Sequence, residues 1–252
     1  MRNRLDKLLF ERGLAPSRER AQALILAGRV LVNQQKVAKP GASVEDAAVL
    51  RVLGDEQRYV SRGGLKLEAA LLRWEIDLSG RSCADIGTST GGFTDCMLQH
   101  GAAGVVAVDT GYGQIAEGLR RDPRVTLLER TNARYLKPGD LPAGINFVSM
   151  DVSFISATLV LPAVIAAVRT PGQQGWALEA VILVKPQFEA GREQVGKGGI
   201  VHDPVAQQFA IDRVRTAVYA LGATASELAD SPILGGGEGA KGNREFLLYA
   251  RF

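Results

Sequence analysis

The chain has 252 residues, of which 46% are hydrophobic and 23% charged, a composition typical of globular proteins. Its two cysteines, Cys83 and Cys96, are too few for a disulfide framework and lack metal-ligand spacing. The net charge is only +3, but residues 1–41 carry nine Lys and Arg against three Asp and Glu, whereas the remainder carries 21 against 24; this basic segment points to a polyanionic partner, although an ordinary solvated surface would carry the same charge. No apolar signal-peptide core follows Met1, and polar residues and a proline interrupt the longest apolar stretch, residues 145–168, so we expect a cytoplasmic protein without stable membrane association.

The first 58 residues predict a small α+β domain. Leucines at helical spacing predict a short helix from Leu5 that ends near Gly13. Ser17 is a candidate N-cap for a second helix over residues 18–26. Short apolar runs separated by turn residues predict strands at residues 30–32, 36–37 and 49–53.

Beyond a polar linker at residues 54–58, apolar strand patterns alternate with helical ones. Strands are predicted at residues 82–86, 105–108, 125–128, 147–150, 181–184 and 245–250. Helices are predicted at residues 65–74, 93–99, 157–168 and 204–220. This alternation is typical of an α/β fold with a mostly parallel sheet covered by helices on both faces. We therefore expect two domains, residues 1–58 and 59–252.

Two glycine-rich stretches, residues 191–199 and 235–242, are predicted to lack regular structure. Flexible loops are the simplest interpretation of both. Loops above such a sheet also often carry function, so they are candidates for lids over a site.

A glycine-rich turn follows the first strand of the second domain. The segment from Ala84 to Phe93 runs from an apolar strand through small residues into a helix, and it lies at a strand's carboxyl end, where open α/β sheets bind ligands. Asp109 closes the next strand, 22 residues after Gly87, a spacing at which a carboxylate can bind the two hydroxyls of a ribose. A nucleoside-type cofactor is therefore favoured over a purely structural turn.

Known phosphate-binding patterns do not fit this turn. A dinucleotide fingerprint requires glycine where Ser89 stands, and a phosphate loop requires lysine where Phe93 stands. An acidic residue two positions before Gly87, without a phosphate-binding lysine, suits S-adenosylmethionine, which carries a ribose, an amine and a sulfonium but no phosphate. The expected cofactor-binding residues are Asp85, Gly87, Thr88, Ser89, Gly91, Gly92 and Asp109.

Four further charged residues are candidates for chemistry. Lys185 and Asp151 each follow an apolar strand, so both are expected at the edge of the sheet that holds the cofactor. Glu245 begins the last strand, and Lys66 lies on the helix before the first strand. Each alone would more commonly be a solvated charge or an ion pair, but two at strand ends beside a cofactor motif favour a site.

With these motifs the sequence resembles the TlyA family, whose members are described as hemolysins and as ribosomal RNA 2'-O-methyltransferases. The motif RLDKLL at residues 4–9, with residues 17–21 and 28–33, is similar to the αL-type RNA-binding domain of a ribosomal small-subunit protein and of pseudouridine synthases. Four further motifs are similar to the methyltransferase part of the family: VSRGGLKL at 60–67, DIG at 85–87, MDVSFIS at 150–156 and VKPQFE at 184–189.

The resemblance implies a Rossmann-like methyltransferase domain of the FtsJ type, a group that uses a Lys-Asp-Lys-Glu tetrad. That tetrad maps onto Lys66, Asp151, Lys185 and Glu245. By this resemblance Lys185 would act on a ribose 2'-hydroxyl, as a base or by steering its oxygen, and the two carboxylates would orient the lysines. Asn132 would lie near the adenine of the cofactor.

The resemblance also implies binding to ribosomal RNA or ribosomal subunits, with cytidine of the small- or large-subunit RNA as the target. The candidate RNA-binding residues are Arg4, Lys7, Arg18, Arg20, Arg29 and Lys36. The family name leaves a membrane-active hemolysin as one alternative, which the lack of an uninterrupted apolar span disfavours. A non-catalytic RNA-binding or ribosome-assembly factor is another, which the complete tetrad disfavours. The sequence predicts no oligomeric state.

Overall fold

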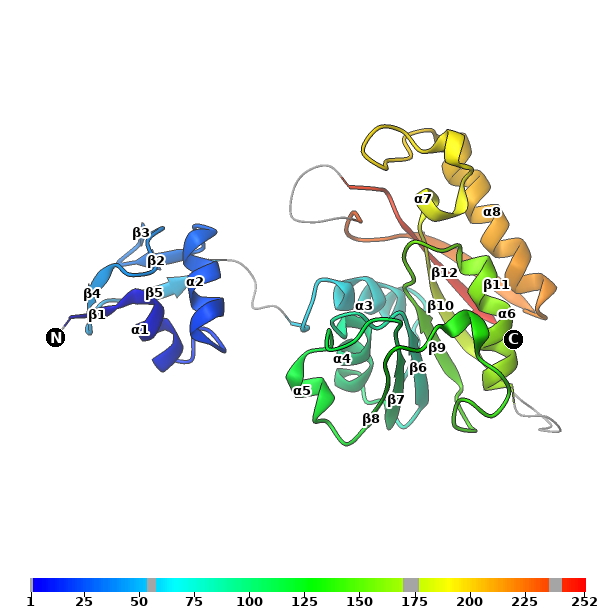
Figure 1. The fold of residues 1–252 in the computed structure, drawn as a ribbon, viewed down its shortest axis with the longest axis horizontal. Coiled ribbons are helices and arrows are strands. Elements are labelled where there is room, and N and C mark those ends of the chain that lie inside the picture. Colours follow the sequence, from blue (N-terminus) through cyan, green and yellow to red (C-terminus); the bar gives the residue numbers. More distant parts are fainter. Residues whose placement is uncertain (1, 54–57, 170–176, 236–241) are drawn as a thin grey trace. The chain divides into compact units, whose positions relative to one another are not determined.

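The structure is a computed structural model that describes residues 2–53, 58–169, 177–235 and 242–252 (Figure 1). The chain forms two compact units, residues 1–58 and 59–252, and each is described by itself. Most of the linker expected at 54–58 lies outside the described residues. No helix in the described part of the chain is long and apolar enough to span a bilayer.

The first unit packs two helices against short strands. The helices are α1 (Leu5–Glu11) and α2 (Arg18–Leu26), and the predicted N-cap is confirmed, since the Ser17 hydroxyl accepts a hydrogen bond from the Arg20 N–H at 3.2 Å. The strands are β1 (Arg2–Arg4), β2 (Val30–Val32), β3 (Gln35–Lys36), β4 (Ser43–Glu45) and β5 (Leu50–Val52). Apolar residues of both helices, with Val30 of β2, form the small core of this unit.

The second unit contains a seven-stranded sheet in the order β11-β12-β10-β9-β6-β7-β8. Its strands are β6 (Ser82–Ile86), β7 (Gly104–Val108), β8 (Val125–Leu128), β9 (Phe147–Met150), β10 (Glu179–Val184), β11 (Ala225–Asp230) and β12 (Phe246–Arg251). The five neighbouring strands β10, β9, β6, β7 and β8 pair in parallel, whereas β12 runs antiparallel to both β10 and β11. The predicted α/β fold is confirmed.

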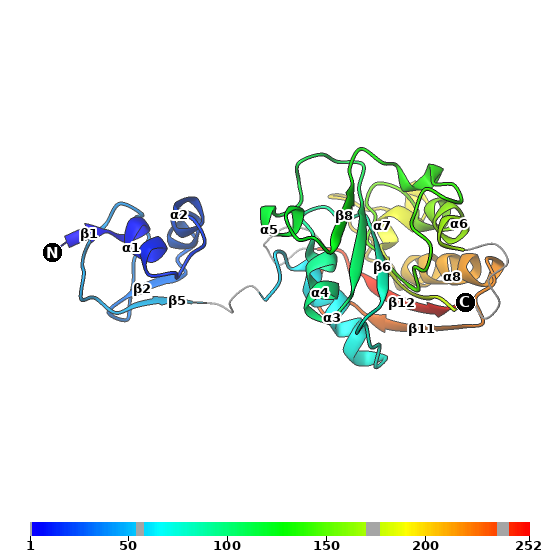
Figure 2. The ribbon, with the colours of Figure 1, turned by 90° about the horizontal axis from the view of Figure 1, so that it is seen from below.

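Helices cover both faces of this sheet (Figure 2). They are α3 (Gly63–Arg73), α4 (Gly92–Gln99), α5 (Glu117–Arg120), α6 (Ala157–Val168), α7 (Pro186–Glu189) and α8 (Pro204–Ala220), with 3-10 turns at Ala133–Tyr135 and Arg192–Gln194. Strand β10 divides its side chains between two cores: Ile182 and Val184 pack on the side of α6 and α8, whereas Leu183 packs on the side of α3 and α4. A strand buried on both faces explains the uninterrupted apolar run in the sequence.

The structure differs from the prediction at several boundaries. The hairpin turn consists of Asn33 and Gln34, both with positive φ, so Gln35 belongs to strand β3. The last strand begins at Phe246, which leaves Glu245 just before it. In the first glycine-rich stretch the structure has only a 3-10 turn, and in the second, residues 236–241 lie outside the described residues.

Candidate active site

The glycine turn after β6 lies against the end of β9. Gly87 has φ +88°, and a Cβ atom there would overlap the carbonyl oxygen of Asp151. Glycine is therefore the residue that permits both this backbone conformation and this close approach. Strands β6 and β9 are neighbours at the point where the strand order reverses, and open α/β sheets bind ligands in the crevice at such a point.

A pocket of about 410 Å³ opens on one side of Gly87. Asp109 and Asn132 line it, together with apolar side chains such as Val108. The Asp109 carboxylate accepts hydrogen bonds from the backbone N–H groups of Ser89 at 2.7 Å and Gly111 at 2.6 Å. A carboxylate has about four acceptor positions, so two remain for the hydroxyls of a ribose.

The composition of this pocket fits S-adenosylmethionine better than a phosphorylated cofactor. No lysine or arginine is among the described residues that line it, whereas phosphate sites normally present basic side chains or a helix N-terminus. The close approach at Gly87 and the fixed Asp109 carboxylate suit a nucleoside. The Asn132 side chain accepts a hydrogen bond from the Arg134 N–H at 3.1 Å, which holds it in the pocket wall.

A second pocket, of about 270 Å³, holds the charged candidates. Lys66, Asp151 and Lys185 all line it, and Glu245 contacts it through Lys66, whose Nζ donates to Glu245 Oε2 at 2.6 Å. Lys185 Nζ lies 2.6 Å from Asp151 Oδ1 and donates a hydrogen bond to Ser153 Oγ at 2.7 Å. Both lysines are 8% exposed, so their charged ends face the pocket rather than bulk solvent.

The topology explains why these four residues meet. Asp151 and Lys185 directly follow β9 and β10, two neighbouring parallel strands, so both lie at the same edge of the sheet. Strand β12 runs antiparallel to β10 and begins opposite its end, with Phe246 paired to Val184. Glu245 therefore stands at that edge although it precedes its strand.

The two pockets adjoin one another. Both are lined by Gly87, Ser89, Asp151 and Ser153. A ligand bound beside Asp109 would thus end near the lysines of the second pocket. The arrangement can place a cofactor's reactive group next to a substrate oxygen held by Lys185.

The remaining turn residues separate into two groups. Thr88 and Gly92 line the pocket of the lysines, whereas Gly91 lines neither pocket. A Cβ atom at Gly91 would overlap the Leu119 side chain. Asp85 also lines neither: its carboxyl is fully buried and accepts hydrogen bonds from Thr94 at 2.6 Å and Ser149 at 3.2 Å. Burial raises the pKa of Asp85 to about 7. Asp85 therefore lies in the interior beneath the glycine turn and not in the wall of either pocket.

Ser153 and Phe154 are among the pocket residues that were not identified from the sequence. Ser153 lines both pockets and contacts Lys185. Phe154 lines the pocket of Asp109, is 92% exposed, and has its ring centroid 5.4 Å from that of Phe188. Both belong to the motif MDVSFIS at 150–156, so the motif itself was the signal, but only Asp151 in it carries a charge.

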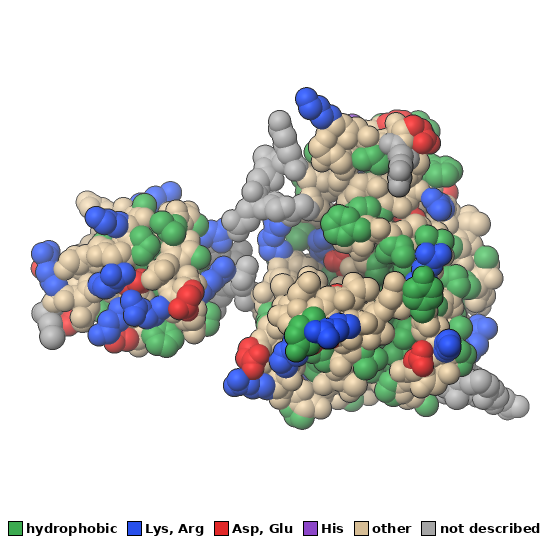
Figure 3. Space-filling view, viewed as in Figure 1, with side chains coloured by type: hydrophobic (Ala, Val, Ile, Leu, Met, Phe, Trp, Pro, Cys, Tyr) green, Lys and Arg blue, Asp and Glu red, His purple; other side chains and the backbone are tan. Residues whose placement is uncertain are grey.

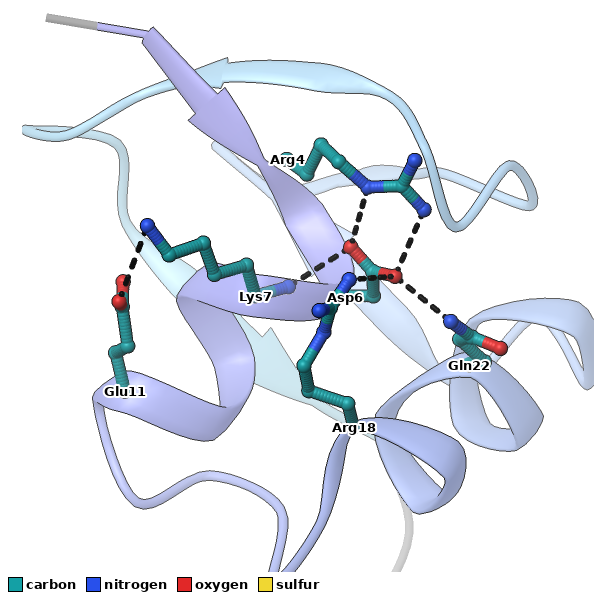
Figure 4. A network of polar contacts seen from close by, with 6 residues as sticks. All are labelled: Arg4, Asp6, Lys7, Glu11, Arg18 and Gln22. Carbon is teal, nitrogen blue, oxygen red and sulfur yellow. Dashed lines mark hydrogen bonds and ion pairs between the residues drawn. The ribbon is translucent and has the colours of Figure 1, made fainter.

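The basic side chains of the first unit are partly organised by one buried carboxylate (Figure 4). Asp6 is fully buried and accepts hydrogen bonds from Arg4 at 2.9 and 3.0 Å, from Arg18 at 3.3 Å and from Gln22 at 2.8 Å. The bond from Arg4 is the main cause that lowers the pKa of Asp6, against the opposing effect of burial. Arg4 and Arg18 remain about half exposed while anchored in this way.

The other candidates for RNA contact lie elsewhere on the first unit. Lys7 forms an ion pair with Glu11 at 3.4 Å, and Lys36 is exposed on strand β3. Arg20 and Arg29 are partly exposed. Figure 3 shows Lys and Arg side chains spread over the visible face of this unit, so positive charge is exposed on its surface.

Comparison with known proteins gives matches over nearly the whole chain. The family described as FtsJ-like methyltransferase matches residues 59–252, and the S4 domain matches residues 3–49. The 16S/23S rRNA (cytidine-2'-O)-methyltransferase TlyA of Mycobacterium tuberculosis is 44% identical over 99% of this chain and 90% of its own length. Hemolysin A of Brachyspira hyodysenteriae is 38% identical over 98% of each chain. A solved structure from Streptococcus thermophilus, provisionally described as a hemolysin, is 42% identical with a TM-score of 0.74 and covers 99% of this chain and 88% of its own.

Proposed function

Since the chain belongs to the family of FtsJ-like methyltransferases, we propose that it methylates the ribose 2'-hydroxyl of cytidine in small- or large-subunit ribosomal RNA. The chain is an S-adenosylmethionine-dependent methyltransferase, and it carries an S4 domain at residues 3–49. The observation that carries the proposal is the pocket lined by Lys66, Asp151 and Lys185 beside the pocket of Asp109. The name of the Mycobacterium tuberculosis relative, at 44% identity, supports cytidine and both ribosomal RNAs as the target.

In this proposal the pocket beside Gly87 holds the cofactor. Asp109 binds the two ribose hydroxyls, Asn132 lies at the adenine, and Gly87 and Ser89 of the glycine turn contact the rest of the cofactor. The bound cofactor supplies a methyl group activated by its sulfonium. The fit rests on the fixed Asp109 carboxylate and on the absence of basic residues among the described ones that line the pocket.

The second pocket holds the target ribose. Lys185, held beside Asp151 and Ser153, would donate a hydrogen bond to the 2'-oxygen and so orient that oxygen toward the methyl group of the cofactor. The cofactor would supply the methyl group, and the Asp151 carboxylate, which lines both pockets, would accept the proton of the hydroxyl. Lys66, held by its ion pair with Glu245, places a second ammonium group at the same wall.

The first unit would bind ribosomal RNA or a ribosomal subunit. Its match to the S4 domain and its exposed basic side chains support this role, because Lys and Arg contacts to phosphates provide most of the sequence-independent affinity for nucleic acid. A ribosomal substrate implies a cytoplasmic protein. The other candidate function is that of a membrane-active hemolysin, which the name of one relative suggests. No described helix is suited to crossing a bilayer.

The test is methyl transfer from labelled S-adenosylmethionine to purified ribosomal subunits, followed by digestion of the RNA to nucleosides. The proposal predicts label in 2'-O-methylcytidine. Label in a base-methylated nucleoside would contradict the ribose as the target, and label in another 2'-O-methylated nucleoside would contradict cytidine alone. Mapping of 2'-O-methylation in cells with and without the gene then identifies the modified position.

A further inference from the structure

Ser153 occupies a central position in the site without belonging to the tetrad. It is among the four residues that line both pockets, and its hydroxyl accepts a hydrogen bond from Lys185 Nζ at 2.7 Å. It therefore lies where the cofactor pocket and the proposed ribose pocket meet. Neither its charge nor its place in the sequence predicts this role.

Lys185 needs more than a charge partner if it is to hold an oxygen in one place. A lysine ammonium is a point charge on a flexible four-carbon stem with three rotatable donors. Its ion pair with Asp151 is short, 2.6 Å from Nζ to Oδ1, yet within the described part of the chain that oxygen has no aligned hydrogen-bond donor. Asp151 thus supplies attraction, and the aligned contact of the ammonium is the one to Ser153.

The loop that carries Ser153 is itself held in place. A few residues further along, the Ser156 hydroxyl donates to Glu189 Oε2 at 2.5 Å, and the Ala157 N–H donates to Glu189 Oε1 at 2.6 Å. Glu189 is 2% exposed and follows Lys185 by four residues. The loops after β9 and β10 are therefore joined at two points, through Lys185 near the pockets and through Glu189 deeper in the fold.

We propose that Ser153 is a positioning residue that sets the direction of the Lys185 ammonium toward the target hydroxyl. With one N–H donated to Ser153 and the charge balanced by Asp151, a further N–H of Lys185 remains for a ligand in the pocket. This inference rests on the proposed function, because it assigns Ser153 a part in the same methyl transfer. It predicts a defect in the rate of transfer and none in binding.

The first measurement is single-turnover methylation of ribosomal subunits by folded, cofactor-binding variants of the full chain. Ser153→Ala should lower the rate about 10- to 100-fold, since a small misplacement of a reacting group costs up to about 10² in rate. Affinity for S-adenosylmethionine and for subunits should stay within about twofold. Ser153→Thr keeps the hydroxyl and should restore at least part of the rate. Ser226→Ala, a serine substitution on β11, is the matched control and should leave the rate unchanged.

A double-variant cycle separates positioning from a general structural effect. If Ser153 acts through Lys185, Ser153→Ala should slow the reaction little further once Lys185→Ala is present. A rate for Ser153→Ala equal to that of the control would overturn the inference, as would full additivity with Lys185→Ala. Failure of the proposed function is distinguishable, because it would show as a normal rate for Lys185→Ala itself.

Discussion

Removing Lys66 should destabilise the second unit strongly, besides affecting catalysis. Lys66 Nζ and Glu245 Oε2 are 2.6 Å apart, and the two side chains are 10% and 3% exposed. Lys66→Ala would leave the Glu245 carboxylate buried without its cation. Breaking a buried pair in this way typically costs about 3 to 5 kcal/mol of unfolding free energy.

The chain offers a matched control at the residue before Glu245. Arg244 pairs with Asp230 at 2.9 Å, but these side chains are 55% and 59% exposed, so Arg244→Ala should cost only about 0 to 1 kcal/mol. Urea unfolding of the full chain can be followed by tryptophan fluorescence, because Trp74 of the second unit stacks on Tyr249 in the folded state. A decrease in stability for Lys66→Ala no larger than that for Arg244→Ala would refute the reasoning.

A double substitution separates the structural contribution of this pair from the catalytic one. Lys66→Met with Glu245→Met removes both charges and keeps similar volumes, and replacing a buried pair with apolar residues of similar volume is often close to neutral for stability. Stability should therefore recover while methyl transfer remains slow. Recovery of the rate together with stability would show that the pair acts on folding alone.

Three further results are expected. Asp109→Ala should weaken S-adenosylmethionine binding in calorimetry, with no binding of NAD by the parent chain; unchanged affinity would contradict the pocket assignment. Lys7→Ala with Lys36→Ala, two exposed lysines outside the ion pairs of the buried Asp6, should lower the slope of log affinity against log salt for ribosomal RNA by about 0.7 to 0.9 for each phosphate that these side chains neutralise, and an unchanged slope would exclude both side chains from the interface. Because the pKa of Asp85 is raised from 3.8 to about 7, the folded chain keeps a proton that the unfolded chain releases, so unfolding free energy should fall as pH rises from about 4 to 7; Asp85→Asn should flatten that fall, and an unaltered pH dependence would contradict the shift.

The strands and helices that were predicted correctly are those in which the pattern of apolar residues matches the side chains buried in the core. The run Ala180 to Val184 is apolar at every position because both faces of β10 are covered, and it was predicted as a strand. Strand β11 was missed because Ala225–Asp230 contains no β-branched or aromatic residue and lies at the edge of the sheet. Strand β1, Arg2–Arg4, was missed for the same reason: backbone pairing with β4 forms it without an apolar pattern.

The site was predictable where charge and strand ends coincide. Asp151 and Lys185 follow apolar strands, so topology alone places them at one edge, whereas Lys66 and Glu245 depended on the family resemblance. Ser153 was not predictable, because a neutral serine in a loop gives no signal until its distance to Lys185 is measured. The sequence predicted Asp85 as a cofactor-binding residue, but its side chain on β6 points toward Thr94 and Ser149.

The most direct test of the proposed mechanism is the rate of methyl transfer by Lys185→Ala. The variant should fold and bind both S-adenosylmethionine and ribosomal subunits, because the proposed contact of Lys185 with the 2'-oxygen matters mainly in the transition state. Single-turnover transfer of labelled methyl to purified subunits should fall about 10² to 10⁴-fold. A near-normal rate from a folded, cofactor-binding Lys185→Ala would remove this residue from the mechanism and contradict the assignment of the pocket as the catalytic site.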